Sequence, residues 1–95
     1  MSPVIEQISK KVLPILINHH VTRAGIFGSA IRGDMNAKSD VDILVEIPGD
    51  ISLLEFAGIK IELEEALGRK VDLVEYAAIK AVIKESIMKE QVSIL

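Results

Sequence analysis

The chain has 95 residues, a formal net charge of −3 and no cysteine. This length allows one small domain, residues 1–95, with a single core, and the lack of cysteine excludes disulfides and thiolate metal sites. An acidic chain is poorly suited to broad nucleic-acid binding, which needs a basic face. No apolar run approaches the roughly 20 residues that cross a bilayer, and no secretory signal is visible, so we expect a cytoplasmic protein without a membrane partner.

Apolar spacing and cap residues predict helices and strands that alternate along the chain. The expected elements are, in chain order, a helix over residues 3–18, a strand over 21–27, a short helix from 29 or 30, a loop over 33–38, a strand over 41–47, a helix over 53–67, a strand over 71–75 and a helix over 79–88. Residues 91–95 fit either a short edge strand or a frayed end.

This order of elements predicts an α/β fold, with a small mixed sheet of three main strands flanked by helices. The helix between the second and third strands is long enough for a right-handed crossover, so these two strands should be parallel. If the first strand is antiparallel to the second, then Gly28-Ser29, Asp40, Asp42 and Asp72 meet at one rim of the sheet.

The acids at this rim are typical of metal-ion chemistry on phosphates. Asp40 and Asp42 lie two residues apart, so both side chains leave the same face of a strand. Two such close carboxylates repel each other unless a positive charge lies between them. Mg²⁺ binds one or two carboxylates together with substrate phosphates, and Asp72 adds a ligand for a second ion or an acceptor for the proton of an attacking hydroxyl.

The turn after the first strand has the features of a phosphate site. Gly28 lets the backbone approach a phosphate closely, and the Ser29 hydroxyl and nearby amides can bind its oxygens. Arg32 can add positive charge near a triphosphate or a leaving pyrophosphate. Taken singly, each of these residues also has an ordinary explanation as a turn or surface residue. The combination indicates function, because Asp is disfavoured inside an apolar strand.

The motif resembles that of the DNA polymerase beta type nucleotidyltransferase superfamily. Its signature is Gly-Ser, a spacer of about ten residues, Asp-x-Asp, and a third Asp on a later strand, and Gly28-Ser29, Asp40-Val41-Asp42 and Asp72 match it. The runs over residues 27–33, 39–45 and 67–74 are similar to the minimal nucleotidyltransferase branch. One departure is Ile31, where relatives often have Ala, and we expect no chemical consequence.

The resemblance implies two Mg²⁺ ions and transfer of AMP from ATP to a hydroxyl. It implies that Gly28 and Ser29 hold the triphosphate, that Asp40 and Asp42 bind the ions, and that Asp72 completes one ion's shell and activates the acceptor. In the minimal branch, the partner is a HEPN-type toxin whose Tyr can be adenylylated, and the small protein acts as its antitoxin. The chain ends soon after Asp72, so we expect the acceptor to come from another protein or from a second copy of the chain.

Three functions stay open at this point. The first is an active nucleotidyltransferase that modifies a partner protein. The second is a non-catalytic nucleotide-binding antitoxin that neutralises its partner by direct contact. The third is a metal-dependent enzyme on another phosphate ester or a small-molecule alcohol. Apolar residues of the last helix and tail either form a contact surface or pack on the sheet.

Overall fold

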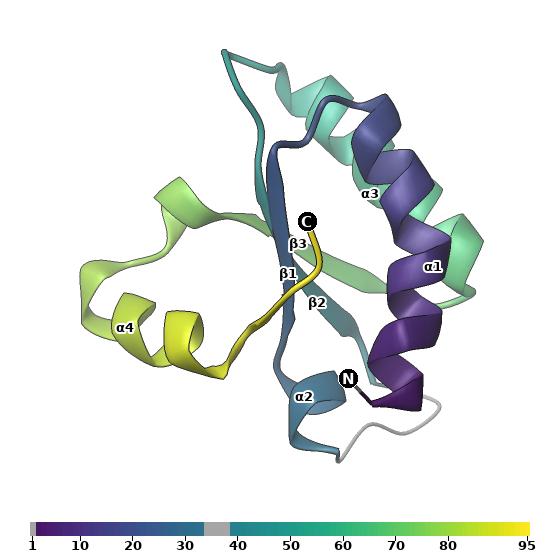
Figure 1. Cartoon of the computed structure of the whole chain (residues 1–95). Helices are drawn as coiled ribbons and strands as arrows, with labels where there is room; N and C mark the ends of the chain where they lie inside the picture. The colour runs from purple at the N-terminus through teal and green to yellow at the C-terminus, as the bar shows by residue number, and fades with distance from the viewer. Residues whose placement is uncertain (1, 34–38) are drawn as a thin grey trace.

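The computed structural model describes residues 2–33 and 39–95, in which helices flank both faces of a four-stranded sheet (Figure 1). The elements are, in chain order, α1 (Pro3–Asn18), β1 (Arg23–Phe27), α2 (Ser29–Arg32), β2 (Val41–Glu46), α3 (Leu53–Leu67), β3 (Val71–Glu75), the 3₁₀ turn η1 (Tyr76–Ala78), α4 (Ala81–Glu90) and β4 (Val92–Ser93). Part of the predicted loop, residues 34–38, lies outside the described residues.

The strand order is β3-β2-β1-β4. Strands β2 and β3 are parallel, and β1 is antiparallel to β2, so the predicted mixed α/β sheet is confirmed. The short strand β4 pairs with β1 in the antiparallel sense, which resolves the question left open for the C-terminal residues in favour of an edge strand.

Helices α1 and α3 cover one face of the sheet, while α4 lies on the opposite side (Figure 1). Val41, Ile43 and Val45 of β2 alternate toward α1 and α3 and are fully buried in an aliphatic core. Leu44 is also fully buried, although it lies on the opposite face. Because β2 is apolar on both faces, it is a central strand of the sheet, between β3 and β1. The buried side chains also fix its register with these neighbours.

Cap residues set the ends of the two long helices. The Ser2 and Ser52 hydroxyls accept hydrogen bonds from the amides of Ile5 and Glu55, at 3.2 and 3.1 Å. Each bond satisfies an amide that the first helical turn leaves without a partner. Gly68 ends α3 in the left-handed conformation, with φ of +66°. None of the described helices is long and apolar enough to cross a membrane.

Four element boundaries differ from the prediction. Two differences are small, since β2 ends at Glu46 and not at residue 47, and α4 ends at Glu90 and not at residue 88. Strand β1 begins at Arg23 and not at Val21, because the Val21 amide bonds back to the Leu16 carbonyl in the turn that follows α1. Helix α4 begins at Ala81 and not at Ile79, because residues 76–78 form a 3₁₀ turn that buries the Tyr76 ring. Apolar periodicity does not detect such backbone turns.

Candidate active site

Three of the predicted site residues meet where β1, β2 and β3 lie side by side. In the register of the sheet, Asp42 lies opposite Phe27 of β1 on one side and opposite Asp72 of β3 on the other. Since paired residues of neighbouring strands point to the same face, Asp42 and Asp72 both lie on the face that is turned away from α1 and α3. The parallel pairing of β2 and β3 therefore brings together two acids that are thirty residues apart in the sequence.

Gly28 lies directly against Asp42. A Cβ atom built on Gly28 would lie only 3.0 Å from the carboxyl carbon of Asp42 and closer still to its Oδ2 atom. Gly28 also has φ of +77° and ψ of −143°, a conformation that side chains rarely allow. Both the close approach and the backbone conformation thus require glycine at this position.

The electrostatics of the rim centre on Asp42. Burial raises the pKa of this carboxyl above its ordinary value, and the negative charges of Asp72 and Asp40 raise the pKa further, while Arg32 opposes them. The carboxylate is thus held in a place where its charge is unfavourable in the protein alone. A bound cation would relieve this repulsion.

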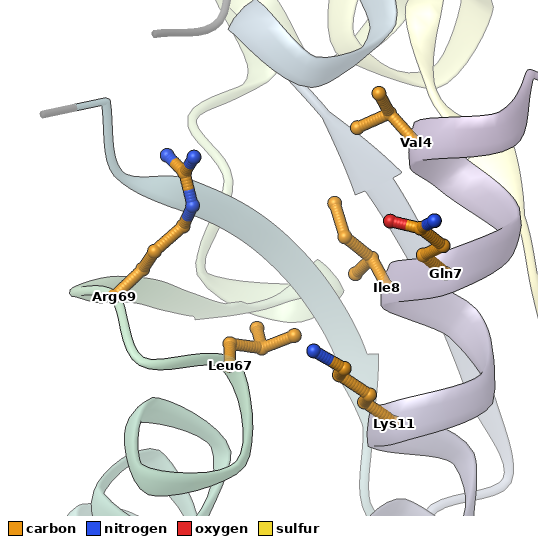
Figure 2. A pocket seen from close by; sticks show the side chains of 6 residues that line it. All are labelled: Val4, Gln7, Ile8, Lys11, Leu67 and Arg69. Carbon is orange, nitrogen blue, oxygen red and sulfur yellow. The ribbon is translucent and has the colours of Figure 1, made fainter. Parts of the chain in front are cut away.

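Asp40 lies just before β2, is exposed, and is close enough to contribute to the field at Asp42. The preceding residue, Ser39, is held by Arg69, whose Nη1 atom donates a hydrogen bond of 3.2 Å to the Ser39 carbonyl oxygen. Figure 2 shows the guanidinium of Arg69 directed toward the start of β2. Arg69 therefore connects the segment before β3 with the segment that presents Asp40.

Ser29 and Arg32 are the first and last residues of α2, which follows Gly28 directly. The amides of Ile31 and Arg32 bond to the Gly28 carbonyl, whereas the first amides of a helix have no acceptor inside it. The guanidinium of Arg32 forms an ion pair of 2.9 Å with Glu90, the last residue of α4. The expected phosphate-binding arginine thus has a carboxylate partner from another element.

The donor set suits Mg²⁺. All three acids offer carboxylate oxygens, and the mutual repulsion around Asp42 is the condition that a divalent cation removes. Among the described residues, no group of three or more acidic, histidine or cysteine side chains converges on one point. Mg²⁺ needs no such cage, since it binds through one or two carboxylates and takes its other ligands from water and substrate phosphates.

A family model described as nucleotidyltransferase domain matches residues 5–94. The chain belongs to this nucleotidyltransferase family. It is 45% identical over 91 residues to the candidate protein adenylyltransferase MJ0435 of Methanocaldococcus jannaschii, covering 96% of this chain and 98% of the relative. It is 42% identical over 72 residues to the protein adenylyltransferase MntA of Thermococcus cleftensis, covering 76% of this chain and 73% of the relative.

Solved structures show the same fold. A candidate minimal nucleotidyltransferase superposes with a TM-score of 0.80 at 31% identity, over 93% of both chains. A toxin–antitoxin complex with AMP-PNP gives a TM-score of 0.81 at 21% identity, over 92% of this chain and 72% of the other. A complex of a tri-AMPylated HEPN toxin from Shewanella oneidensis with its MNT antitoxin gives 0.75 at 18% identity, over 96% and 71%.

Sequence reasoning alone misses several residues of this nucleotidyltransferase that position its site. Arg69 holds Ser39, Glu90 pairs with Arg32, and the Glu64 carboxylate accepts the Val71 amide at 3.0 Å just before Asp72. All three are charged residues near helix or strand ends, where such residues are ordinary surface residues by default. Only the fold shows that each contacts a segment that carries a site residue.

A hollow of about 240 Å³ on the other side of the sheet belongs to a different surface. It lies between the start of α1 and the end of α3 and is lined by Val4, Gln7, Ile8, Lys11, Leu67 and Arg69 (Figure 2). None of the three acids lines it. Of the residues named here, Arg69 also contacts Ser39, which directly precedes Asp40.

Proposed function

We propose that this nucleotidyltransferase transfers AMP from ATP to a hydroxyl group, a Tyr, of a HEPN-type partner protein, and that it is the antitoxin of that pair. The observation that carries the proposal is the convergence of Gly28, Asp42 and Asp72 on one rim of a nucleotidyltransferase fold. The relatives named protein adenylyltransferase, one of them 45% identical over nearly the whole chain, support protein as the acceptor class. The AMP-PNP complex and the AMPylated HEPN toxin among the structural neighbours support ATP and the partner.

In this proposal the turn after β1 binds the triphosphate. Gly28, which has no side chain, lets the Asp42 carboxylate lie against this turn. Ser29 offers a hydroxyl and an amide at the start of α2 for the phosphate oxygens. Arg32 lies close enough to Asp42 to affect its charge and can exchange Glu90 for a phosphate oxygen. The triphosphate then lies next to the acids.

Asp40, Asp42 and Asp72 would hold two Mg²⁺ ions, which would neutralise the phosphate charge and stabilise the attacking and leaving oxygens. Asp72 is exposed and lies beside Asp42, on the side of β2 that is away from β1 and Gly28. This position supports Asp72 as the group that accepts the proton of the incoming hydroxyl. Asp42 of β2 lies between the turn after β1 and Asp72 of β3. In this proposal it therefore lies between the triphosphate and the group that accepts the proton.

The first test is calorimetric titration of ATP into the protein with and without Mg²⁺. We expect Mg²⁺-dependent binding that Asp42→Asn abolishes and that the exposed control Asp50→Asn retains. Equal binding to the wild type and Asp42→Asn would contradict the assignment of the nucleotide to this rim.

The second test is coexpression with a HEPN-type protein encoded beside it, followed by intact-mass analysis. We expect the partner to gain the mass of AMP, and Asp72→Asn to abolish that gain. A partner that carries no AMP, yet is neutralised equally by the wild type and Asp72→Asn, would instead establish an antitoxin that acts by contact.

A further inference from the structure

A second hollow, of about 390 Å³, opens on the same face of the sheet as the acids, between the sheet and α4. Helix α4 stands off from the sheet on this side, opposite α1 and α3 (Figure 1). The hollow is lined by Phe27, Leu44, Asp72, Val74, Ala78, Ile79, Lys80, Ile83 and Ile87. Its volume lies in the range of about 300–1,000 Å³ that is usual for small-ligand sites.

The hollow continues the acidic row of the sheet. Leu44 and Val74 lie opposite each other in the register, each two residues beyond Asp42 and Asp72 on the same strand face. The acids therefore form one row across β2 and β3, and an apolar row follows it immediately. Asp72 belongs to both, since it also lines the hollow.

The chemistry of the lining distinguishes between two ligand types. Apart from Asp72 and Lys80, the described residues that line the hollow are all aliphatic or aromatic. An adenine base carries several ring nitrogens and an amino group, and burial against these apolar walls would leave them without hydrogen-bond partners. A phenol is apolar except for one hydroxyl at its tip, so it needs apolar walls and one acceptor at the end of the cavity.

The order of the strands also favours the acceptor. Gly28 and Ser29 follow β1, Asp42 is on β2, and Asp72 is on β3, in this order across the sheet. In an in-line displacement, the attacking oxygen approaches the α-phosphorus opposite the leaving pyrophosphate. With the pyrophosphate at Gly28 and Ser29, the attacking oxygen comes from the side of Asp72, which is one of the residues that line the hollow.

We propose that this hollow binds the phenol ring of the acceptor tyrosine, a placement that rests on the proposed function. The tyrosine hydroxyl gives its proton to the Asp72 carboxylate as its oxygen forms the new bond to the α-phosphorus of ATP. The bond from the α-phosphorus to the oxygen that bridges to the β-phosphorus breaks, and pyrophosphate leaves with the electron pair. Lys80 adds a positive charge that favours the developing phenolate.

Methyl NMR tests this placement directly, because three isoleucines line the hollow. The probe is N-acetyl-L-tyrosinamide, with N-acetyl-L-serinamide as the matched probe that lacks the ring. We expect the tyrosine probe alone to shift the methyl signals of Ile79, Ile83 and Ile87. Ile83→Ser should weaken its binding roughly tenfold through lost apolar contact, whereas Val82→Ser, on the same helix but outside the lining, should leave it unchanged.

Three results would overturn the proposal. One is the absence of shifts at the lining methyls, and another is equal weakening by Ile83→Ser and Val82→Ser. The third is that Mg²⁺ and ATP displace the tyrosine probe and themselves shift the signals of the same methyl groups. This result would place the adenine base in the hollow. The proposed function fails separately, through the Asp42→Asn titration, so the two failures are distinguishable.

Discussion

Gly28 and Asp42 occupy one space, since the Asp42 carboxylate lies where a side chain on Gly28 would be. One residue belongs to the turn after β1 and the other to the middle of the acidic row. The glycine therefore has two roles, because it permits the positive φ of the turn and it allows the carboxylate to lie against the backbone. In the proposed function, this contact keeps the turn that would bind phosphate beside the acids.

The first prediction concerns Gly28→Ala, which should both destabilise the protein and displace Asp42. Gly49 provides the matched control, because it has the same φ of +77° but open space where its Cβ would be. Gly49→Ala should lower the free energy of unfolding by about 1–2 kcal/mol through backbone strain. Gly28→Ala should lower the free energy of unfolding by about 1–3 kcal/mol more than Gly49→Ala does. It should also weaken Mg²⁺-dependent ATP binding at least tenfold. Denaturant unfolding and calorimetry measure both, and normal ATP binding by Gly28→Ala would contradict the role of the contact.

The second prediction is that Asp42→Asn stabilises the protein at neutral pH without Mg²⁺. Burial and the charges of Asp72 and Asp40 raise the folded-state pKa of Asp42 above its ordinary 3.8, so folding favours the protonated form. The favourable contribution is then present below the unfolded-state pKa and is lost as the pH rises through the folded-state pKa. Asparagine is uncharged at every pH. The gain in the free energy of unfolding of Asp42→Asn over the wild type should therefore be full at pH 7 and disappear in acid.

Thermal unfolding at several pH values, beside Asp50→Asn, tests this sign. A change of about 1 kcal/mol moves the Tm of a chain of this length by roughly 4–8 °C, so the effect is measurable. Lower stability of Asp42→Asn at pH 7 would show that the carboxylate makes a favourable interaction that outweighs burial and repulsion.

The third prediction is that Glu90 competes with ATP for Arg32. The side chains of Arg32 and Glu90 are 55% and 38% exposed, so Glu90→Gln should change the free energy of unfolding by less than about 1 kcal/mol. The substitution removes the negative charge that competes with a phosphate for this guanidinium, and ATP should bind about two- to fivefold more tightly. Glu85→Gln is the control, because it removes the same charge from the same helix but breaks the pair with Lys89 and not the one with Arg32. An equal gain in ATP affinity from both variants would show that the effect comes from net charge alone. Arg32→Gln, in contrast, should weaken ATP binding.

The sheet and the acidic rim could be predicted because the sequence encodes them locally. Apolar residues on both faces of β2 indicate a buried strand, and the length of the following helix indicates a parallel partner. These two facts bring Asp72 beside Asp42 without further information. The place of Gly28 at the same rim depended on β1 being antiparallel to β2, which the structure shows.

The contacts that adjust the rim could not be predicted, because they join side chains from distant elements. Arg32 and Glu90 are 58 residues apart, and Arg69 and Ser39 are 30 residues apart. No periodicity relates such positions, and exposed charged residues have many available partners. The hollow beside Asp72 is likewise formed by residues of β1, β2, β3, η1 and α4, which are far apart in the sequence.

The last prediction concerns Gly25, which allows the C-terminal segment to pack on β1. The Tyr76 hydroxyl donates a 2.9 Å hydrogen bond to Oε1 of Gln91, and a Cβ on Gly25 would overlap with that oxygen and lie 3.0 Å from the hydroxyl. Gly25→Ala must therefore break this bond or displace Gln91, at a cost of about 1–3 kcal/mol. Gly58→Ala, inside α3 with open space around its Cβ, should instead stabilise by about 0.5–1 kcal/mol.

Chemical unfolding of both variants separates the two effects, because the substitution is the same and only the surroundings differ. Tyr76→Phe should cost about 0.5–1.5 kcal/mol, since it removes the hydroxyl but keeps the buried ring. If the bond is what fixes Gln91, hydrogen exchange of the amides at residues 91–95 should rise in Gly25→Ala and Tyr76→Phe but not in Gly58→Ala. Unchanged exchange in the first two variants would mean that β4 is held by its pairing with β1 alone.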